Sequence, residues 1–559
     1  MSKETISDNK LKQPLEEMSS KDKMINGSAW MTGGSILSRL LGALYIIPWM
    51  AWMGNQDIAE SANALYTIGY TPYALFLNIA TAGVPSAIAK QVSYYNSLNE
   101  YEISRNIYKK GLQIMAVTGI FSALIMYVAA PFIAASSPNV SVDNATQVIR
   151  SLSWALLIIP CMSVTRGYIQ GHHIMKYSAI SQFIEQLARV IFMLAAVYLI
   201  RQVWNGSVVN AVAASTFAAV IGAVFSIGYL FYIIWRKKPE LDERAAQSLN
   251  KITISTNEIF KSIIRTAIPF IIIGSGITLF QMIDQFTFQQ IMTQVSNLSP
   301  KQIVNHYGVA SGNVNKLIMI VISFGGSMAI TAVPLISELI AKNDLKKIAH
   351  QISDSLQLFS FIMLPASIGM MIVAEPLYTV FYGQSDLGTT ALQVASFMSL
   401  FLGLFVLMGS TMQAANQTRS ALLALVIGLA VKLATQYPML AWAGTNGMFI
   451  SNIFGFGVTV LLMLWKMYKV TRFDVGLILR RVLLMLILTL AMAIVTFAVK
   501  ELLYLMMDSE NSRTSALLVM AISAGSGGIV YMYGSLKTRL ADRLLGARVT
   551  GLRTKLHIK

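Results

Sequence analysis

Apolar segments about as long as a bilayer is thick recur along this chain from end to end. A helix needs roughly 20 predominantly apolar residues to cross the hydrocarbon core. The chain has 559 residues, of which 55% are hydrophobic and only 12% are charged. Long Leu-, Ile- and Met-rich runs such as residues 482–499 exclude the short alternating strands of an outer-membrane barrel. The pattern therefore predicts an all-α polytopic membrane protein.

The charges of the loops predict how these segments are oriented. Every second loop carries Lys and Arg, whereas the loops between them are nearly bare of both. Because cytoplasmic loops carry the excess of basic residues, both termini are expected in the cytoplasm. The same rule explains the net charge of +17 without nucleic acid. The fourteen predicted spans lie at about 28–53, 62–93, 107–135, 145–170, 177–201, 208–235, 260–292, 305–339, 347–374, 388–413, 419–442, 446–468, 476–506 and 514–535.

The first twelve spans read as two related halves. Residues 169–192 align with residues 412–435, and residues 81–90 resemble residues 330–339. Six spans followed by six of the same orientation indicate a parallel repeat, in which the substrate site lies between the halves. The predicted organisation is a disordered cytoplasmic tail (1–27), an N-lobe (28–235), a cytoplasmic loop (236–259), a C-lobe (260–469), two further spans (470–535) and a basic cytoplasmic tail (536–559).

The loops of this chain offer no chemistry that would suggest an enzyme. They are too short for a catalytic domain, and they contain no phosphate-binding glycine motif, metal-ligand cluster or nucleophile triad. A polytopic glycosyltransferase would need an acidic catalytic loop, which the sequence lacks. We therefore expect a transporter without a metal or cofactor.

Two cations inside the predicted spans are the strongest candidates for function, because charges are costly in the bilayer. Arg39 lies roughly 16 Å into the first span, near the midplane. Lys316 lies about 15 Å into the eighth. Cations at mid-depth favour an anionic substrate, and arginine suits phosphate because its planar group forms paired hydrogen bonds. The alternatives are that Arg39 snorkels and that Lys316 lies nearer the interface.

The other polar residues inside the spans are charged residues with open roles, an expected ion pair and neutral hydrogen-bonding groups. Asp284 could be a counter-ion for Arg39 across the lobes, and Lys432 could contact the substrate or serve the structure. Glu185 precedes Arg189 by one turn, so we expect a structural ion pair. The candidate substrate site is completed by neutral hydrogen-bonding groups: Ser35, Asn63, Gln281 and Asn315.

The runs SRLLGALY (38–45) and TAGVPSAIAK (81–90), and above all residues 165–190, resemble the MurJ-like, stage V sporulation protein B-like branch of the multidrug/oligosaccharidyl-lipid/polysaccharide exporter superfamily. The resemblance implies two six-helix lobes in a V, and two further helices that form a groove for a polyprenyl tail. Arg39 matches the arginine of the family's first-span motif, and Lys316 lies near a span-8 arginine. Tyr45 and Asn63 stand where Gram-negative members carry an arginine and an acid.

The resemblance also implies a function, namely outward flipping of the lipid-linked peptidoglycan precursor lipid II across the bacterial plasma membrane for cell wall synthesis. The alternatives are a flippase for another polyprenyl-linked polysaccharide (capsule, teichoic acid or sporulation) and a drug/cation antiporter. The expected partners are the lipid-linked oligosaccharide and membrane lipids. We expect a monomer, and leave open an association with the cell wall synthesis machinery. The expected driving force is the membrane potential or an ion gradient.

Overall fold

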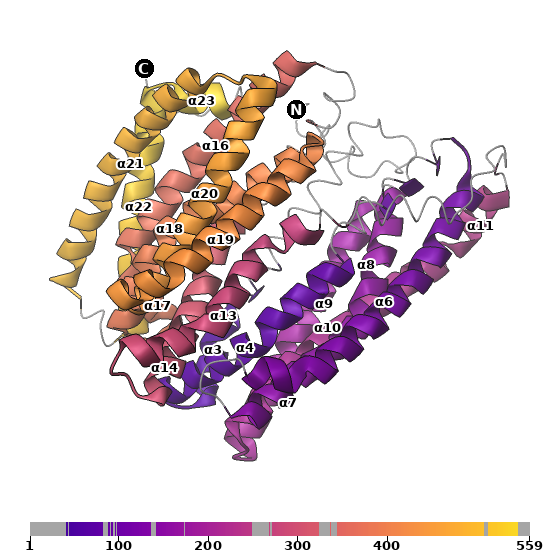
Figure 1. The fold of residues 1–559 in the computed structure, drawn as a ribbon, viewed down its shortest axis with the longest axis horizontal. Helices are drawn as coiled ribbons and strands as arrows, with labels where there is room; N and C mark the ends of the chain where they lie inside the picture. Colours follow the sequence, from indigo (N-terminus) through magenta and orange to yellow (C-terminus); the bar gives the residue numbers. More distant parts are fainter. Residues whose placement is uncertain are drawn as a thin grey trace, which may run out of the picture.

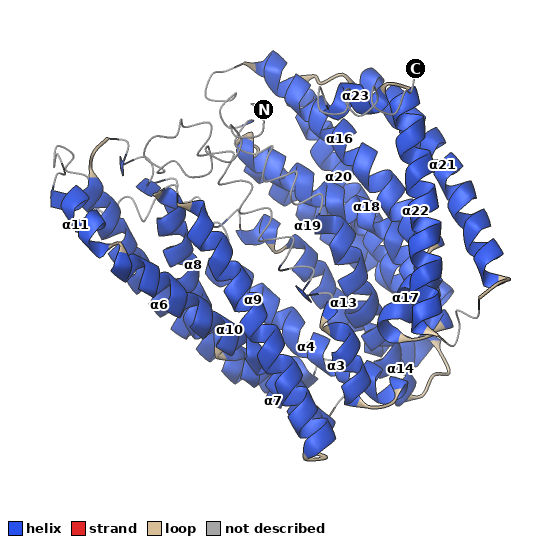
Figure 2. Ribbon diagram, turned by 180° about the vertical axis from the view of Figure 1, so that it is seen from behind, coloured by secondary structure: helices blue, strands red, loops and turns tan. Residues whose placement is uncertain are grey.

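The computed structural model describes residues 38, 41–42, 44–81, 88–89, 91–92, 95–96, 98–135, 141–172, 174–246, 248, 268, 271–323, 336, 344–507 and 512–545. Within these ranges the chain forms helices and connecting turns, and no strand (Figure 2). The predicted all-α class is confirmed.

Ten of the predicted spans appear as helices that are long and apolar enough to cross a membrane. They correspond to the third to sixth and the ninth to fourteenth predicted spans. Two of them continue through a change of helix, one at Trp154 and one at Leu199. The ten are α6 (Tyr101–Ala135), α7 (Val142–Ser153) with α8 (Ala155–Gly171), α9 (Met175–Tyr198) with the π-helix η1 (Leu199–Val203), α10 (Val208–Arg236), α16 (Leu345–Ile372), α18 (Asp386–Ala414), α19 (Thr418–Ala443), α20 (Thr445–Thr471), α21 (Val475–Tyr504) and α22 (Arg513–Lys537).

The other four predicted spans each include residues outside the described ranges, and their described portions are helical. In the first half these portions are α3 (Ile46–Met53) and α4 (Gln56–Thr81). In the second half they are α13 (Gly276–Val295) and α14 (Pro300–Tyr307), which continues as the π-helix η2 (Gly308–Val314). Ser299 begins α14 with a reciprocal cap, because its hydroxyl accepts from the Gln302 amide while the Gln302 side chain accepts from the Ser299 amide.

The helices form two bundles that meet at one end (Figure 1). We call α3, α4 and α6–α10 the N-terminal group, and α13, α14, η2 and α16–α20 the C-terminal group. The groups meet where α4 packs against η2, α13 and α14, and where α3 contacts α17 (Ala374–Tyr382). This is called the closed end below. The short polar helices α11 (Lys238–Ala246) and α23 (Leu540–Leu545) lie at the opposite end.

The last two spans form an appendage to the C-terminal group. Helices α21 and α22 pack on each other, α21 packs on α16, and α22 packs on α17 (Figures 1 and 2). The hydroxyl of Tyr531 in α22 donates a hydrogen bond of 2.9 Å to the carbonyl of Phe361 in α16.

Candidate functional site

The closed end is held by a row of amide and hydroxyl contacts between the two groups. The hydroxyl of Ser61 in α4 donates to Asn305 Oδ1 in α14 at 2.6 Å. Two residues further along α4, the amide of Asn63 donates to Asn313 Oδ1 in η2. Asn313 in turn donates to the hydroxyl of Tyr378 in α17 at 2.7 Å. Helix α4 is therefore tied directly to α14 and η2, and through Asn313 to α17.

Two glycines allow this close approach. A Cβ atom on Gly308 would lie 2.6 Å from the carbonyl oxygen of Glu60, and one on Gly312 would lie 2.3 Å from the Asn63 amide nitrogen. Real Cβ atoms do not approach so closely, so any larger residue would push η2 away from α4. The fit depends on both glycines.

Lys316 lies directly beside this contact, in the helical segment that follows η2. Its Nζ donates to Asn63 Oδ1 at 2.6 Å, and it lies 5.0 Å from the ring centroid of Tyr66 and 5.9 Å from that of Trp49. In the part of the chain that the structure describes, Lys316 contacts no carboxylate. The predicted neighbours Lys316 and Asn63 are thus brought together, although they come from different halves.

Aromatic side chains of α3 and α4 form a row next to Lys316. Trp49 packs edge-on against Tyr66 at 6.2 Å, Tyr66 stacks on Tyr70 at 5.8 Å, and Tyr70 lies 5.5 Å from Tyr73. We call these four residues the aromatic row. An aromatic face attracts a cation without neutralising its charge, so the aromatic row stabilises the ammonium group of Lys316.

Arg189 is the second cation of this region, and its surroundings correct the sequence prediction. Glu185 does not form the expected ion pair with Arg189: its carboxylate accepts from Arg166 in α8 at 2.6 Å. Among the described residues, the buried Nε of Arg189 has no hydrogen-bond partner. The electrostatic partners of the guanidinium group are the phenols of Tyr70, Tyr66 and Tyr45 and, with a smaller effect, the Glu185 carboxylate. Tyr66 therefore contributes to the electrostatic surroundings of both Lys316 and Arg189.

Asp284 and Lys432 form an ion pair inside the C-terminal group. Lys432 is fully buried, and its Nζ lies 2.5 Å from Asp284 Oδ1 and 2.7 Å from Ser451 Oγ. Gln436 and Asn452 each donate to the Asp284 carboxylate at 3.0 Å. Asp284 therefore has a counter-ion within its own group, whereas its expected pairing with Arg39 stays a prediction, because Arg39 lies outside the described residues. Of the two roles left open for Lys432, the geometry favours the structural one.

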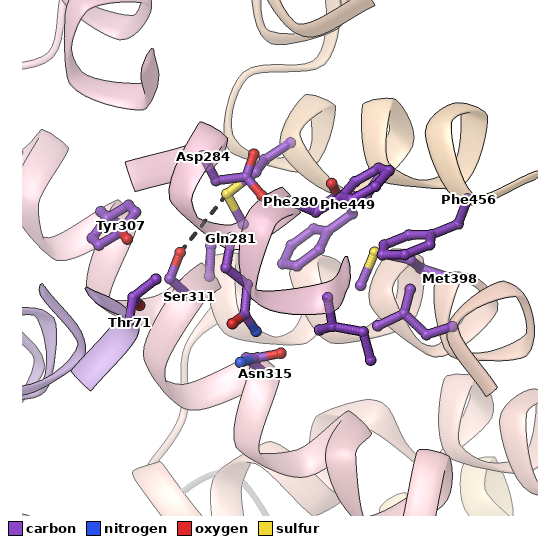
Figure 3. A pocket seen from close by; sticks show the side chains of 15 residues that line it. Thr71, Phe280, Gln281, Asp284, Tyr307, Ser311, Asn315, Met398, Phe449 and Phe456 are labelled. Carbon is purple, nitrogen blue, oxygen red and sulfur yellow. Dashed lines mark hydrogen bonds between the residues drawn. The ribbon is translucent and has the colours of Figure 1, made fainter. Parts of the chain in front are cut away.

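A small cavity next to this ion pair collects several of the predicted polar residues (Figure 3). Gln281 and Asn315 point toward each other there, and Asp284 lies at its edge. Its volume of about 30 Å³ is enough for one or two water molecules and far too small for a sugar headgroup. Gln281 and Asn315 therefore line the same small cavity, and their role in substrate binding stays a prediction.

Several residues of this region were not singled out from the sequence. Trp49 and Tyr378 are buried contacts of the closed end that follow no local pattern. Arg39 and Ser35 lie outside the described residues, so their place in the site stays a prediction.

The chain is similar to known transporters over most of its length. Residues 24–340 match the family described as "Polysaccharide biosynthesis protein". "Lipid II flippase MurJ" of Bacillus subtilis (strain 168) is 33% identical over 540 residues, which cover 95% of this chain and 98% of that protein. "Stage V sporulation protein B" of the same strain is 22% identical over 421 residues, or 74% of this chain and 77% of that protein.

Solved structures with little sequence identity share the fold. A lipid II flippase MurJ in an inward closed conformation has a TM-score of 0.60 at 14% identity, covering 92% of this chain and 99% of that one. An inward-facing MATE family transporter also has a TM-score of 0.60 at 14% identity, covering 78% and 95%. The resemblance noted in the sequence is confirmed, and the chain belongs to the Polysaccharide biosynthesis protein family of multi-pass membrane proteins.

Proposed function

We propose that this protein flips lipid II, the undecaprenyl-pyrophosphate-linked peptidoglycan precursor, from the inner to the outer leaflet of the bacterial plasma membrane. The observation that carries the proposal is the pair Lys316 and Arg189. Lys316 lies beside Tyr66 where the two groups meet, Arg189 of α9 interacts electrostatically with the same phenol, and among the described residues neither cation forms a salt bridge with a carboxylate. A relative named as a lipid II flippase supports the same substrate. The protein acts as a transporter and not as an enzyme.

The chemistry of this region suits a diphosphate attached to sugars. A guanidinium group offers two parallel hydrogen bonds to phosphate oxygens, and an ammonium group adds a compact charge. The aromatic row offers flat apolar faces with hydroxyl groups at their edges, to which sugar rings can pack. Arg39, predicted from the sequence at mid-depth, is expected to be a third cation of this site.

An apolar groove in the C-terminal part is the candidate site for the polyprenyl tail. A cavity of about 490 Å³ is lined by α16, α18, α20 and α21, chiefly by Leu, Phe and Trp side chains. The four walls are represented by Phe359 of α16, Phe401 of α18, Leu461 and Trp465 of α20, and Leu479 of α21. The tail would lie there while the headgroup occupies the region of Lys316. This supports the predicted role of the thirteenth span in a lipid groove.

Transport proceeds by alternating access in this proposal. The loop charges place both termini in the cytoplasm, so the closed end faces outward. A phosphate that binds Lys316 would compete with Asn63 for the same Nζ, which lies 2.6 Å from the Asn63 oxygen in the closed arrangement. Headgroup binding would thereby loosen the contact between α4 and η2. The protein acts as a monomer on this view.

The membrane potential is the proposed driving force. Each elementary charge that crosses about 100 mV is worth about 2.3 kcal/mol, so a diphosphate leaving a negative interior gains about 4 kcal/mol. Flipping at an undiminished rate in vesicles with a collapsed potential would contradict this part.

The proposal is tested by flipping assays in vesicles and by rescue of a bacterium depleted of its own lipid II flippase. We expect the chain to expose lipid II on the far leaflet and to prevent lysis. Lys316→Ala, Arg189→Ala and Arg39→Ala should each lower flipping at unchanged expression, whereas Lys346→Ala, which removes an exposed cation, should not. Full flipping by all three variants would overturn the binding assignment.

The second candidate is a flippase for another polyprenyl-linked polysaccharide. The family description and the similarity to stage V sporulation protein B favour it. The same vesicles separate the two, because this candidate requires flipping of a lipid-linked capsule or teichoic acid precursor and none of lipid II. A drug/cation antiporter fits less well, because Asp284, the carboxylate that borders the small cavity, is already neutralised by Lys432.

A further inference from the structure

A second pocket opens on the side of the N-terminal group, away from the contact between the groups. It has a volume of about 460 Å³ and lies between α6, α7 and α10. Its lining includes Tyr127, Asp143, Thr146, Arg150 and Trp154. We call it the α7 pocket. It combines a cation, an anion, a hydroxyl and two aromatic rings, and it has no part in the transport mechanism proposed above.

The α7 pocket lies near one membrane surface. Helices α7 and α8 together span 30 residues, or about 45 Å, against a hydrocarbon core of roughly 30 Å. Arg150 lies eight residues after Val142, the first residue of α7, and therefore only about 5 Å inside the hydrocarbon if the helix is centred. Side chains lean toward the N-terminus of their helix, so Arg150 leans toward the headgroups.

The polar groups of the pocket share one face of α7. Asp143, Thr146, Arg150 and Trp154 follow one another at intervals of three or four residues, which places them in a line. Because α7 begins at the membrane surface, the line runs from a carboxylate outermost, through a guanidinium group, to an indole ring deepest. This order matches a lipid, whose charges lie outside its apolar part.

Neither charge of the pocket is neutralised by the protein in the described ranges. The Arg150 guanidinium lies 4.6 Å from the ring centroid of Tyr127, and its Nε donates a long hydrogen bond of 3.4 Å to the Tyr127 carbonyl. Asp143 forms no ion pair there, and it lies about 10 Å from Arg150 along the helix. An unpaired cation at this depth is expensive and is retained where it binds something.

A buried hydroxyl points to the same conclusion. Thr146 lies between the two charges, and only 8% of its surface is exposed. Within the described part of the protein its Oγ1 has no hydrogen-bond partner. A buried polar atom left without a partner costs free energy, so an absent ligand atom is the natural acceptor or donor for it.

The exposed side chains around the pocket indicate whether its ligand comes from water or from the bilayer. Val128 and Phe132 of α6 are 68% and 79% exposed, and Trp154 is 50% exposed. Such apolar side chains face acyl chains in a membrane protein. The ligand therefore reaches the pocket from the bilayer.

We propose that the α7 pocket binds the headgroup of a phospholipid that carries a primary amine. The phosphate accepts hydrogen bonds from Arg150 and from the hydroxyl of Thr146, while the ammonium group pairs with Asp143. The glycerol and the first acyl carbons lie against Tyr127 and Trp154. A zwitterion satisfies both free charges, whereas an anionic headgroup such as phosphatidylglycerol leaves Asp143 facing a negative ligand.

The proposal is tested by measuring lipids bound to the purified full-length protein by native mass spectrometry. The protein is titrated with phosphatidylethanolamine and with phosphatidylglycerol. We expect the amine-bearing lipid to bind several-fold tighter. Arg150→Ala should weaken binding of both lipids about tenfold, the loss of one charge-assisted contact. Asp143→Asn should abolish the preference and leave phosphatidylglycerol binding intact, and Thr146→Val should weaken both lipids by a smaller factor.

Two controls keep the test decisive. Lys301→Ala removes a 74% exposed cation at the same closed end and should leave lipid binding unchanged. Arg150→Lys keeps the charge but not the paired hydrogen bonds, so it should bind at an intermediate level even if Arg150→Ala fails to fold. Equal binding by the wild type, Arg150→Lys and Asp143→Asn for both lipids would overturn the proposal and assign Arg150 to unspecific snorkelling. A preference for phosphatidylglycerol in the wild type would also overturn it.

Discussion

Lys432 and Lys316 both lie inside predicted spans of the second half, but the protein treats them in opposite ways. Lys432 is fully buried and is bound by a carboxylate, a hydroxyl and a backbone carbonyl. Lys316 is half-buried and has an amide oxygen and two aromatic rings as neighbours. The carboxylate lies beside the lysine that joins helices within one group. The lysine between the groups has only neutral neighbours among the described residues.

The first half repeats this contrast with arginines. Glu185 neutralises Arg166, which also donates to Ser181 and Ser226 at 2.9 Å and so joins α8, α9 and α10. Arg189, one turn after Glu185, is left among tyrosines. In each half, then, one cation is bound by an acid from a neighbouring helix, whereas another forms no salt bridge among the described residues.

The largest expected effect is a loss of stability when Lys432 is removed from its ion pair with Asp284. Lys432→Met leaves the Asp284 carboxylate buried without a cation, which should lower the free energy of unfolding by about 3 kcal/mol or more. The measurement is thermal unfolding of the detergent-solubilised protein. The double variant Lys432→Met with Asp284→Leu should recover much of the loss, since a buried ion pair can be replaced by apolar groups. A single variant as stable as the wild type would mean that the pair contributes little.

Replacing Lys316, which has no acid partner among the described residues, should lower flipping and leave stability almost unchanged. Lys316→Met replaces a half-buried cation by an apolar side chain of similar length, so we expect little loss of stability. Flipping should fall at least about tenfold, the effect of one lost charge-assisted contact to phosphate. Flipping in vesicles and thermal unfolding are measured on the same preparation. A variant that loses stability but retains flipping would reverse the assignment of the two lysines.

The comparison can also be sharpened by turning the free lysine into a paired one. Asn63→Asp places a carboxylate at the atom that already lies 2.6 Å from Lys316 Nζ. Flipping should fall about fivefold or more although every cation is still present, because the substrate must now displace a charged partner. The new ion pair and the loss of the hydrogen bond that the Asn63 amide donates to Asn313 Oδ1 act in opposite directions, so we expect a small net change in thermal stability. Asn63→Ala is the matched variant, and it should reduce flipping less than Asn63→Asp does.

The sequence predicted the spans well because membrane thickness and apolar length are linked directly. It also predicted that cations at mid-depth matter, and the structure leaves Lys316 without an acid in the described region. The sequence predicted the ion pairs less well. An ion pair between residues one turn apart is inferred from a single helix, and this led to the prediction of Glu185 with Arg189. In the structure, Arg166 from a neighbouring helix binds Glu185 instead. Depth along a helix can be read from a sequence, but the direction a side chain faces depends on packing.

For the same reason the sequence did not predict the Asp284–Lys432 ion pair, whose members lie 148 residues apart in the chain. The polar groups of α13, α19 and α20 were visible as polar residues in apolar spans, but not as one network. A useful signal is the number of serine and amide side chains near a charge on adjacent spans. Ser451, Asn452 and Gln436 accompany the paired charges, as Ser181 and Ser226 accompany Arg166.

The smallest expected effect concerns the contact that brings Lys316 to Asn63. Gly312→Ala places a Cβ atom 2.3 Å from the Asn63 amide nitrogen, so η2 must move away from α4. Alanine normally stabilises a helix relative to glycine, so the variant should fold while its closed end opens more often. Spin labels at Asp57 and Lys301, exposed residues that face each other across this end at 3.9 Å, report the separation once Cys161 is replaced. Gly228→Ala is the control, since a Cβ atom there meets no neighbour. The fraction of separated molecules should rise in Gly312→Ala alone, and identical distance distributions in both variants would show that the contact between α4 and η2 does not hold the closed end.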